Sequence, residues 1–219
     1  MTLRPKLVTK MIDKIASWKF AEEYARESDA ISAARRRANE LGVEAVTAAT
    51  GQQLAFLATA LGAKSIVEVG TGAGVSGLWL LSASKNSVLT TIDSEPEFQN
   101  AARESFKSAG IPASRMRVIS GKATEVLANM AESAYDLVFL DIDPINLDTV
   151  VAKALGLLRP GGVLVIAHAL WRDRVPNPTL RDDETSSLRA IGRNFLELED
   201  YVATISLVGD GLLLVAKRA

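Results

Sequence analysis

The sequence predicts an α/β fold, in which one mostly parallel β-sheet carries helices on both faces. After residue 64, short apolar runs alternate with segments of helical periodicity, which is the pattern of repeated β-α units. The apolar runs are continuous, as expected for strands whose two faces are both covered. Near the end of the chain only Gly209-Asp210-Gly211 separates two apolar runs, a connection too short for a parallel crossover. The last two strands are therefore expected to be antiparallel.

The individual elements follow from the same patterns. We predict strands at 65–69, 88–92, 116–120, 136–140, 162–167, 201–208 and 212–216. Helices are predicted between them, at 75–84, 95–109, 122–130, 146–158 and 184–198. The first sixty residues carry helical patterns only, which we assign to 7–28, 30–41 and 51–61. Gly42 and Gly62 suit the C-terminal ends of the last two of these helices.

The chain is expected to form a single domain. Its 219 residues are enough for one α/β domain with a full core, and we find no internal repeat, low-complexity segment or linker. We therefore assign residues 1–219 to one domain, with N-terminal helices over 1–62 and the α/β core over 63–219.

Composition narrows the classes of function. The net charge of −1 does not favour nucleic acid as a partner, and the basic run Arg35–Arg37 fits the solvated face of a helix better than an anionic-ligand site. The absence of cysteine excludes disulfides and thiolate catalysis, and it is compatible with the cytoplasmic location that we expect. No apolar run could span a bilayer, and Lys6, Lys10 and Lys14 interrupt any signal peptide. No membrane partner is expected.

Leu7, Met11, Ile15 and Trp18 form an apolar stripe at helical spacing. We expect this helix to pack on the domain, with a dimer contact or a lid over a substrate pocket as the alternatives.

The glycine-rich stretch from Ile66 to Ser76 ends an apolar run and opens a helical pattern. Glycines there allow a tight turn and a close approach of the backbone to a ligand. Glu68 is unsuited to a pyrophosphate but suited to a ligand with an ammonium group, although a paired structural acid is the alternative. Ser76 lies in the first turn of the helix, where it could cap the helix or bind a carboxylate.

Asp93 ends the second predicted strand, where an acid can hold the two hydroxyls of a ribose. It could instead cap the helix that follows, because Ser94, Glu95 and Pro96 form a good helix start. Glu68 and Asp93 together describe a nucleoside that carries an amino acid, which is S-adenosylmethionine.

A dinucleotide site is the competing interpretation of the glycine loop. The residues from Gly72 to Gly77 fit G-x-G-x-x-G, but counting from Gly70 the third glycine position holds Val75. Glu68, the antiparallel end of the sheet and the lack of a second nucleotide-binding half favour a methyltransferase over an NAD-dependent oxidoreductase.

Polar residues also follow the fourth and fifth strands, where parallel sheets bind their ligands. Asp141 could hold a cation or face a sulfonium, whereas Asp143 is expected to be more exposed. His168, the only histidine, could be a general base, a metal ligand or a structural residue. Trp171 could line an aromatic pocket.

Five motifs form an ordered series that resembles the class I O-methyltransferases of the catechol and caffeoyl-coenzyme A type, bacterial branch. They are Val-Glu-Val-Gly-Thr-Gly-Ala-Gly-Val-Ser, Thr-Ile-Asp-Ser-Glu-Pro-Glu, Asp-Leu-Val-Phe-Leu-Asp, Leu-Arg-Pro-Gly-Gly-Val-Leu-Val and Gly-Asp-Gly-Leu, within about residues 44–217. The resemblance implies a Rossmann-like seven-stranded sheet with a reversed last strand, a homodimer and S-adenosylmethionine as cofactor. The cofactor-binding residues that we predict on this basis are Val46, Thr47, Glu68, Gly70, Thr71, Gly72, Ser76, Asp93, Ser94, Ala123 and Asp141.

The chain departs from the family pattern at the metal site. Family members usually bind a divalent cation through the acid matching Asp141 and an Asp-Asn pair after the fifth strand, which here reads Ala167-His168. The family's lysine is Pro144 here. We hypothesise that His168 acts as general base with Asp141 orienting it or the substrate. The alternative keeps a cation such as Mg²⁺, bound by Asp141, His168 and water.

The sequence thus predicts an S-adenosylmethionine-dependent O-methyltransferase that acts on a small phenolic or catechol-like acceptor with an altered or absent metal site. A protein that binds S-adenosylmethionine or its demethylated product without turnover is the first alternative, and an NAD-dependent oxidoreductase the second. We expect the acceptor pocket to lie between the N-terminal helices and the segment 171–186.

Overall fold

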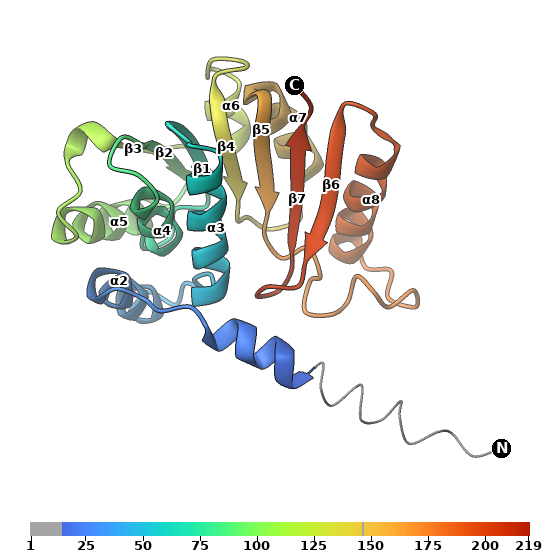
Figure 1. The fold of residues 1–219 in the computed structure, drawn as a ribbon, viewed down its shortest axis with the longest axis horizontal. Coiled ribbons are helices and arrows are strands. Elements are labelled where there is room, and N and C mark those ends of the chain that lie inside the picture. Colours follow the sequence, from blue (N-terminus) through green and yellow to red (C-terminus); the bar gives the residue numbers. More distant parts are fainter. Residues whose placement is uncertain (1–14, 146) are drawn as a thin grey trace.

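The computed structural model describes residues 15–145 and 147–219, which form one seven-stranded sheet with helices on both sides (Figure 1). The strands are β1 (Ser65–Val69), β2 (Val88–Asp93), β3 (Met116–Ser120), β4 (Tyr135–Leu140), β5 (Leu158–Ile166), β6 (Tyr201–Ser206) and β7 (Leu212–Lys217). Their order in the sheet is β3-β2-β1-β4-β5-β7-β6. Within the described residues β7 alone runs against its neighbours, which confirms the predicted mostly parallel sheet with a reversed last strand.

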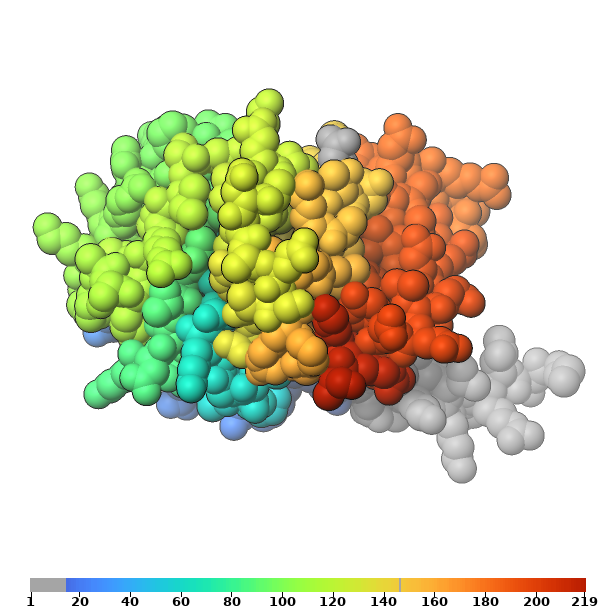
Figure 2. Space-filling model, turned by 90° about the horizontal axis from the view of Figure 1, so that it is seen from above, coloured from blue at the N-terminus to red at the C-terminus, as the bar shows by residue number. Residues whose placement is uncertain are grey.

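The helices of the core lie in two layers. They are α2 (Asp29–Glu40), α3 (Ala48–Ala60), α4 (Val75–Ser82), α5 (Pro96–Ser108), α6 (Ala123–Leu127), α7 (Leu147–Leu157) and α8 (Asp183–Glu197). Side chains of α2 to α5 share one apolar cluster with one face of the sheet, and side chains of α6 to α8 share another with the opposite face. Viewed from above, the residues around 90–120 lie at one end of the molecule and those after 180 at the other, as the strand order requires (Figure 2).

Alternation along the strands explains the two apolar clusters. In β1, Ile66 belongs to one cluster and Val67 to the other, and both side chains are fully buried. Phe139 and Leu140 divide in the same way at the end of β4. Burying each such side chain contributes about 1.5–3 kcal/mol. The central strands therefore contain continuous apolar runs, because each face of the sheet packs on a helical layer there.

Three predicted boundaries are wrong for identifiable reasons. The first helix ends at residue 23 instead of 28, and Ser28 instead caps α2 by accepting a hydrogen bond from Ile31 N (3.4 Å). Helix α3 begins three residues early because Thr47 Oγ1 accepts from Thr50 N (3.1 Å). Strand β5 begins at Leu158, which pairs with Tyr135 before a shift in register. The other ends differ by a few residues.

The helix over residues 15–23 lies below the sheet in Figure 1, at the end where the parallel strands finish. Leu7 and Met11 of the predicted stripe lie outside the described residues. Ile15 and Trp18 remain 66% and 50% exposed, so they are not core residues. Trp18 Nε1 nevertheless donates a hydrogen bond to Leu207 O (3.1 Å), which ties the helix to the turn between β6 and β7. In the described part of the chain, no helix has the length and apolar character needed to cross a membrane.

Candidate active site

The glycine loop after β1 turns sharply because its backbone adopts conformations that only glycine accepts easily. Gly70, Gly72 and Gly74 have φ values of 96°, 48° and 87°. A Cβ atom on Gly70 would lie 2.1 Å from Asp141 O, so the loop packs directly on the backbone at the end of β4. Gly74 precedes α4 and supplies no side-chain cap. The first N–H groups of α4 are thus open to an anionic group of a ligand.

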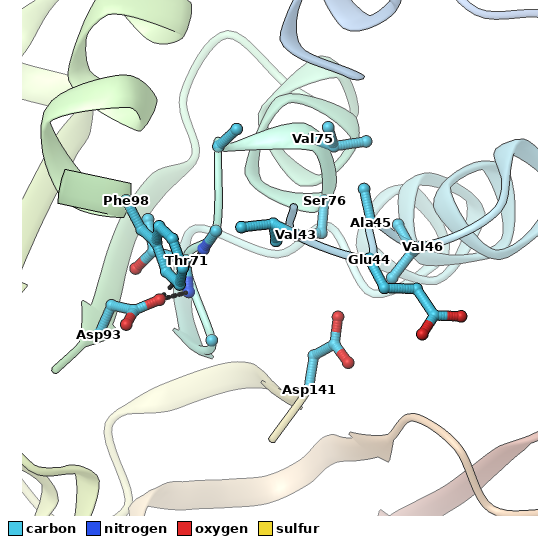
Figure 3. Close-up of a pocket in the computed structure, with 13 residues that line it drawn as sticks. Val43, Glu44, Ala45, Val46, Thr71, Val75, Ser76, Asp93, Phe98 and Asp141 are labelled. Atoms are coloured by element: carbon cyan, nitrogen blue, oxygen red, sulfur yellow. Dashed lines mark hydrogen bonds between the residues drawn. The ribbon is translucent and has the colours of Figure 1, made fainter. Parts of the chain in front are cut away.

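A cavity of about 160 Å³ opens above this loop (Figure 3). Its walls come from residues 43–46 before α3, the loop 70–76, and the side chains Asp93, Phe98 and Asp141. Figure 3 shows the carboxylate of Asp141 pointing into the space between the loop and residues 43–46. The cavity sits at the carboxyl ends of β1, β2 and β4, where open α/β sheets bind their ligands.

Asp93 anchors the loop as well as lining the cavity. Its Oδ2 accepts hydrogen bonds from Thr71 N (2.9 Å) and Gly72 N (3.1 Å), and its Oδ1 accepts from Glu95 N (3.0 Å). The N-cap of α5 is Glu95 and no side chain caps this helix, so the alternative that Asp93 is a helix cap is wrong. Oδ1, which accepts a single hydrogen bond, has further acceptor capacity for a ligand hydroxyl.

Glu68 lies near the end of β1, is completely buried and is not among the residues that line the cavity. Its Oε2 accepts from Thr91 Oγ1 (2.6 Å), whereas Oε1 has no hydrogen-bond partner among the described residues. Burial raises the pKa of Glu68 to about 7; the hydroxyls of Ser76 and Thr91 oppose this, and the charges of Asp141 and Asp93 add to it. An unpaired buried carboxylate is costly unless a cation approaches, so the site favours a ligand with a positive group.

The other predicted cofactor-binding residues divide into two groups. Val46, Gly70, Thr71, Gly72, Ser76, Asp93 and Asp141 line the cavity, whereas Thr47, Ser94 and Ala123 do not. Thr47 caps α3, Ser94 is exposed, and Ala123 begins α6 in the opposite apolar layer. The sequence did not predict that Glu44 and Phe98 line the cavity. Phe98 could have been predicted, because it is an aromatic residue in the first turn of the helix that follows Asp93.

His168 joins two carboxylates. Its Nε2 lies 3.2 Å from Asp141 Oδ1 and its Nδ1 lies 3.0 Å from Asp210 Oδ2. The carboxylates therefore contact different nitrogens of one imidazole ring. The hydrogen bond to Asp141, assisted by Asp210, raises the pKa of His168 to about 9 against the effect of burial. At neutral pH the ring is an imidazolium that donates to both acids.

This geometry bears on the two roles predicted for His168, general base and metal ligand, which both stay predictions. A general base must be unprotonated, and a protonated ring with both nitrogens donating offers no lone pair to a proton or a metal. The described residues contain no group of three or more acids and histidines placed to hold a metal ion. Ala167 and Pro144 supply no ligand atom from their side chains. The residues present do not fit a divalent cation.

The segment after β5 is strained. His168, Trp171, Arg172 and Asp173 have φ values of 55°, 48°, 53° and 59°, a left-handed region that costs roughly 1 kcal/mol or more for each such residue. Asp210 Oδ1 accepts from Arg172 N (2.7 Å) and so holds this turn. The Trp171 ring meets His168 edge-on at 6.1 Å. Asp143 is exposed, as expected, and caps its own turn through Ile145 N (2.8 Å).

Comparison with known proteins identifies the family. The sequence matches the O-methyltransferase family over residues 22–218. The chain belongs to this family. A protein of Mycobacterium tuberculosis strain H37Rv named "Probable O-methyltransferase" is 47% identical over 197 residues, which cover 90% of this chain and 88% of that protein.

Solved structures of similar fold agree with this assignment. A protein from Corynebacterium glutamicum superposes with a TM-score of 0.86 at 32% identity, over 94% of this chain and 98% of that one. The O-methyltransferase TomG from Streptomyces achromogenes, involved in tomaymycin synthesis and solved in complex with SAM, gives a TM-score of 0.81 at 27% identity, over 92% and 95%. The predicted family is therefore confirmed.

Proposed function

We propose that this O-methyltransferase transfers the methyl group of S-adenosylmethionine to a hydroxyl of a small phenolic or catechol-like acceptor, without a divalent cation. The observation that carries the proposal is the cavity at the ends of β1, β2 and β4, which Ser76 at the start of α4 and Asp93 line. The orphaned carboxylate oxygen of Glu68 is buried on the strand that leads into the glycine loop of this cavity. Each of these three residues matches one part of the cofactor.

The cofactor's parts find partners at separate residues. Glu68 attracts the ammonium group and Ser76 with the start of α4 receives the carboxylate. Asp93 accepts the ribose hydroxyls, and Phe98 packs against the base. The TomG structure contains SAM in the same fold, which supports this assignment.

Asp141 lies where the acceptor hydroxyl has to arrive. It lines the cavity, and its Oδ1 is held by the imidazolium of His168. In the proposed step the acceptor oxygen attacks the methyl carbon in line, the O–C bond forms and the S–C bond breaks. Asp141 takes up the hydroxyl proton, and the products are a methyl ether and S-adenosylhomocysteine. His168 is a positioning residue in this scheme.

A binding protein without turnover remains the alternative, favoured by the protonation of His168, which removes the base that the sequence suggested. A cytoplasmic location and a homodimer stay predictions. The test is turnover of hydroxylated aromatics by protein stripped of metal with a chelator, read as S-adenosylhomocysteine formed. Binding of S-adenosylmethionine with no turnover on any phenol or catechol would favour the binding protein.

A further inference from the structure

A second cavity, of about 590 Å³, lies beside the cofactor cavity. Glu44 lines both, so the two spaces adjoin. Asp210 lines the second cavity, and through His168 it is linked to Asp141 in the first. A molecule in the second cavity could therefore present an oxygen to the methyl group of a molecule in the first.

We propose that this second cavity is the acceptor pocket, and that it selects hydroxylated aromatics whose other substituents are cationic or uncharged, against those that carry an anion. The proposal rests on the proposed methyl transfer and deepens it by naming the charge class of the acceptor.

The walls of the pocket are built by tertiary contacts. Glu22 Oε1 accepts from Gly209 N (2.6 Å) and Glu22 Oε2 accepts from Thr47 Oγ1 (3.2 Å), which fastens the N-terminal helix to the turn between β6 and β7. Trp18 on the same helix donates to Leu207 O. The left-handed turn that carries Arg172 forms the opposite wall and is held by Asp210. The pocket is thus assembled from four segments of the chain, within residues 18–22, 44–47, 170–173 and 207–210.

The apolar lining suits a flat ring. Trp18, Leu170 and Leu207 all line the cavity. An aromatic and two aliphatic side chains bind the face of an aromatic acceptor through dispersion and desolvation.

The charged lining sets the preference for charge. Four carboxylates line the pocket, those of Glu22, Glu44, Asp173 and Asp210, against the single guanidinium of Arg172. Arg172 pairs with Glu44 (3.3 Å), and the positive charge of His168 is shared between Asp210 and Asp141. Glu22 and Asp173 keep uncompensated negative charge within the described residues. An anionic acceptor would be repelled and a cationic one attracted.

The test uses three catechols that differ only at the end of one side chain: dopamine with an ammonium, hydroxytyrosol with a hydroxyl, and 3,4-dihydroxyphenylacetate with a carboxylate. Their dissociation constants are measured by calorimetry on the complex with S-adenosylhomocysteine, and their turnover with S-adenosylmethionine. We expect the carboxylate to bind about 10-fold more weakly than the ammonium at low salt, with the gap shrinking as salt is added.

Two variants assign this preference to the pocket. Asp173→Asn removes one charge while keeping a side chain that tolerates φ > 0. It should reduce the difference in affinity between the ammonium and the carboxylate compound about 3-fold. Asp148→Asn, on the exposed face of α7, is the matched control and should leave the difference in affinity unchanged. Trp18→Leu should weaken all three compounds alike.

Equal binding of the carboxylate and the ammonium, or a gap that Asp173→Asn does not alter, overturns the acceptor-pocket proposal even if methyl transfer is observed. The proposed function fails separately, if the catechols bind in the expected order and none is methylated. Absence of any catechol binding to a complex that holds S-adenosylhomocysteine also overturns the pocket.

Discussion

His168 Nδ1 lies 3.0 Å from Asp210 Oδ2, although the two residues are 42 positions apart in the chain. They meet because β7 runs antiparallel to β5, with Ile166 opposite Leu213, so the turn before β7 reaches the end of β5. Through this contact the turn that leads into the reversed strand β7 contributes a residue to the site. It supplies the second carboxylate that keeps His168 charged.

The protonation of His168 can be measured directly because it is the only histidine in the chain. In protein freed of any affinity tag, NMR of its imidazole should show both ring nitrogens protonated at pH 7.5 and a pKa near 9. The folded-state pKa lies above that of the unfolded chain. The ion pairs therefore contribute their full stability below about pH 6.5 and lose it as pH rises through about 9, a change of about 1–2 kcal/mol after solvent screening. A measured pKa at or below 6.5 would contradict this.

Asp210→Asn should lower the pKa of His168, because one of the two carboxylates that favour the imidazolium loses its charge. It should also lower the free energy of unfolding by about 1–2 kcal/mol, since the hydrogen bonds to His168 and Arg172 N are weakened. Urea unfolding and NMR titration measure the two effects. Asp148→Asn serves as control and should change neither. An unchanged histidine pKa in Asp210→Asn would show that the bridge is not formed in solution.

Gly70→Ala should destabilise the loop and abolish cofactor binding. The added Cβ would sit 2.1 Å from Asp141 O in a backbone with φ of 96°. Because the Cβ atom would meet a backbone atom, the contact cannot be relieved by a side-chain rotation. The free energy of unfolding should fall by about 2 kcal/mol or more. Gly156→Ala is the matched control. Its Cβ would meet nothing within 4 Å and it lies within α7, so it should stabilise the protein by about 0.5–1 kcal/mol. Thermal unfolding with and without S-adenosylhomocysteine compares the two.

The raised pKa of Glu68 predicts that binding of S-adenosylmethionine releases a proton. Its folded-state pKa of about 7 lies above the ordinary value of 4.5, so at pH 6 most of the free protein holds a proton there. Ionisation costs stability as pH rises from about 4.5 through 7, and an arriving ammonium offsets that cost. Calorimetry at pH 6 in two buffers of different ionisation enthalpy measures the released proton. Glu68→Gln should abolish the release and weaken binding about 10- to 100-fold. If the variant releases as much proton on binding as the unchanged protein, the proton does not come from Glu68.

Chelation should leave methyl transfer intact. The nitrogens of His168 face carboxylates on different sides, and the described residues assemble no metal-binding group. Paramagnetic Mn²⁺ added at one equivalent should therefore not broaden the imidazole resonances of His168. Selective broadening at that ratio, or activity that falls with EDTA and returns with Mg²⁺, would show that a cation displaces the bridge.

The sheet could be predicted because the central strands β1, β4 and β5 contain buried apolar runs and the final turn is too short for a crossover. The ends of the N-terminal helices could not, because they depend on whether Ser28 and Thr47 act as caps. Serine and threonine are common in loops as well as at helix N-caps. The periodicity of the flanking residues does not tell whether such a residue caps a helix or lies in a loop.

That Gly70, Ser76, Asp93 and Asp141 line one cavity could be predicted, since they follow strand ends that meet at one edge of the sheet. The charge of His168 could not, because it depends on two acids from distant segments. In the sequence Asp210 belongs to a tight turn and to the Gly-Asp-Gly-Leu motif, and neither assigns it a contact in the site. Its role becomes visible only when the pairing of β5 with β7 is known.

The most direct test of the account is methyl transfer by tag-free, chelator-treated protein given S-adenosylmethionine and a catechol, with the product identified by mass spectrometry. The account predicts a methyl ether and an equal amount of S-adenosylhomocysteine, at a rate that added Mg²⁺ does not raise. Strict dependence of the product on Mg²⁺, or no methyl ether from any hydroxylated aromatic while the cofactor binds, would contradict it.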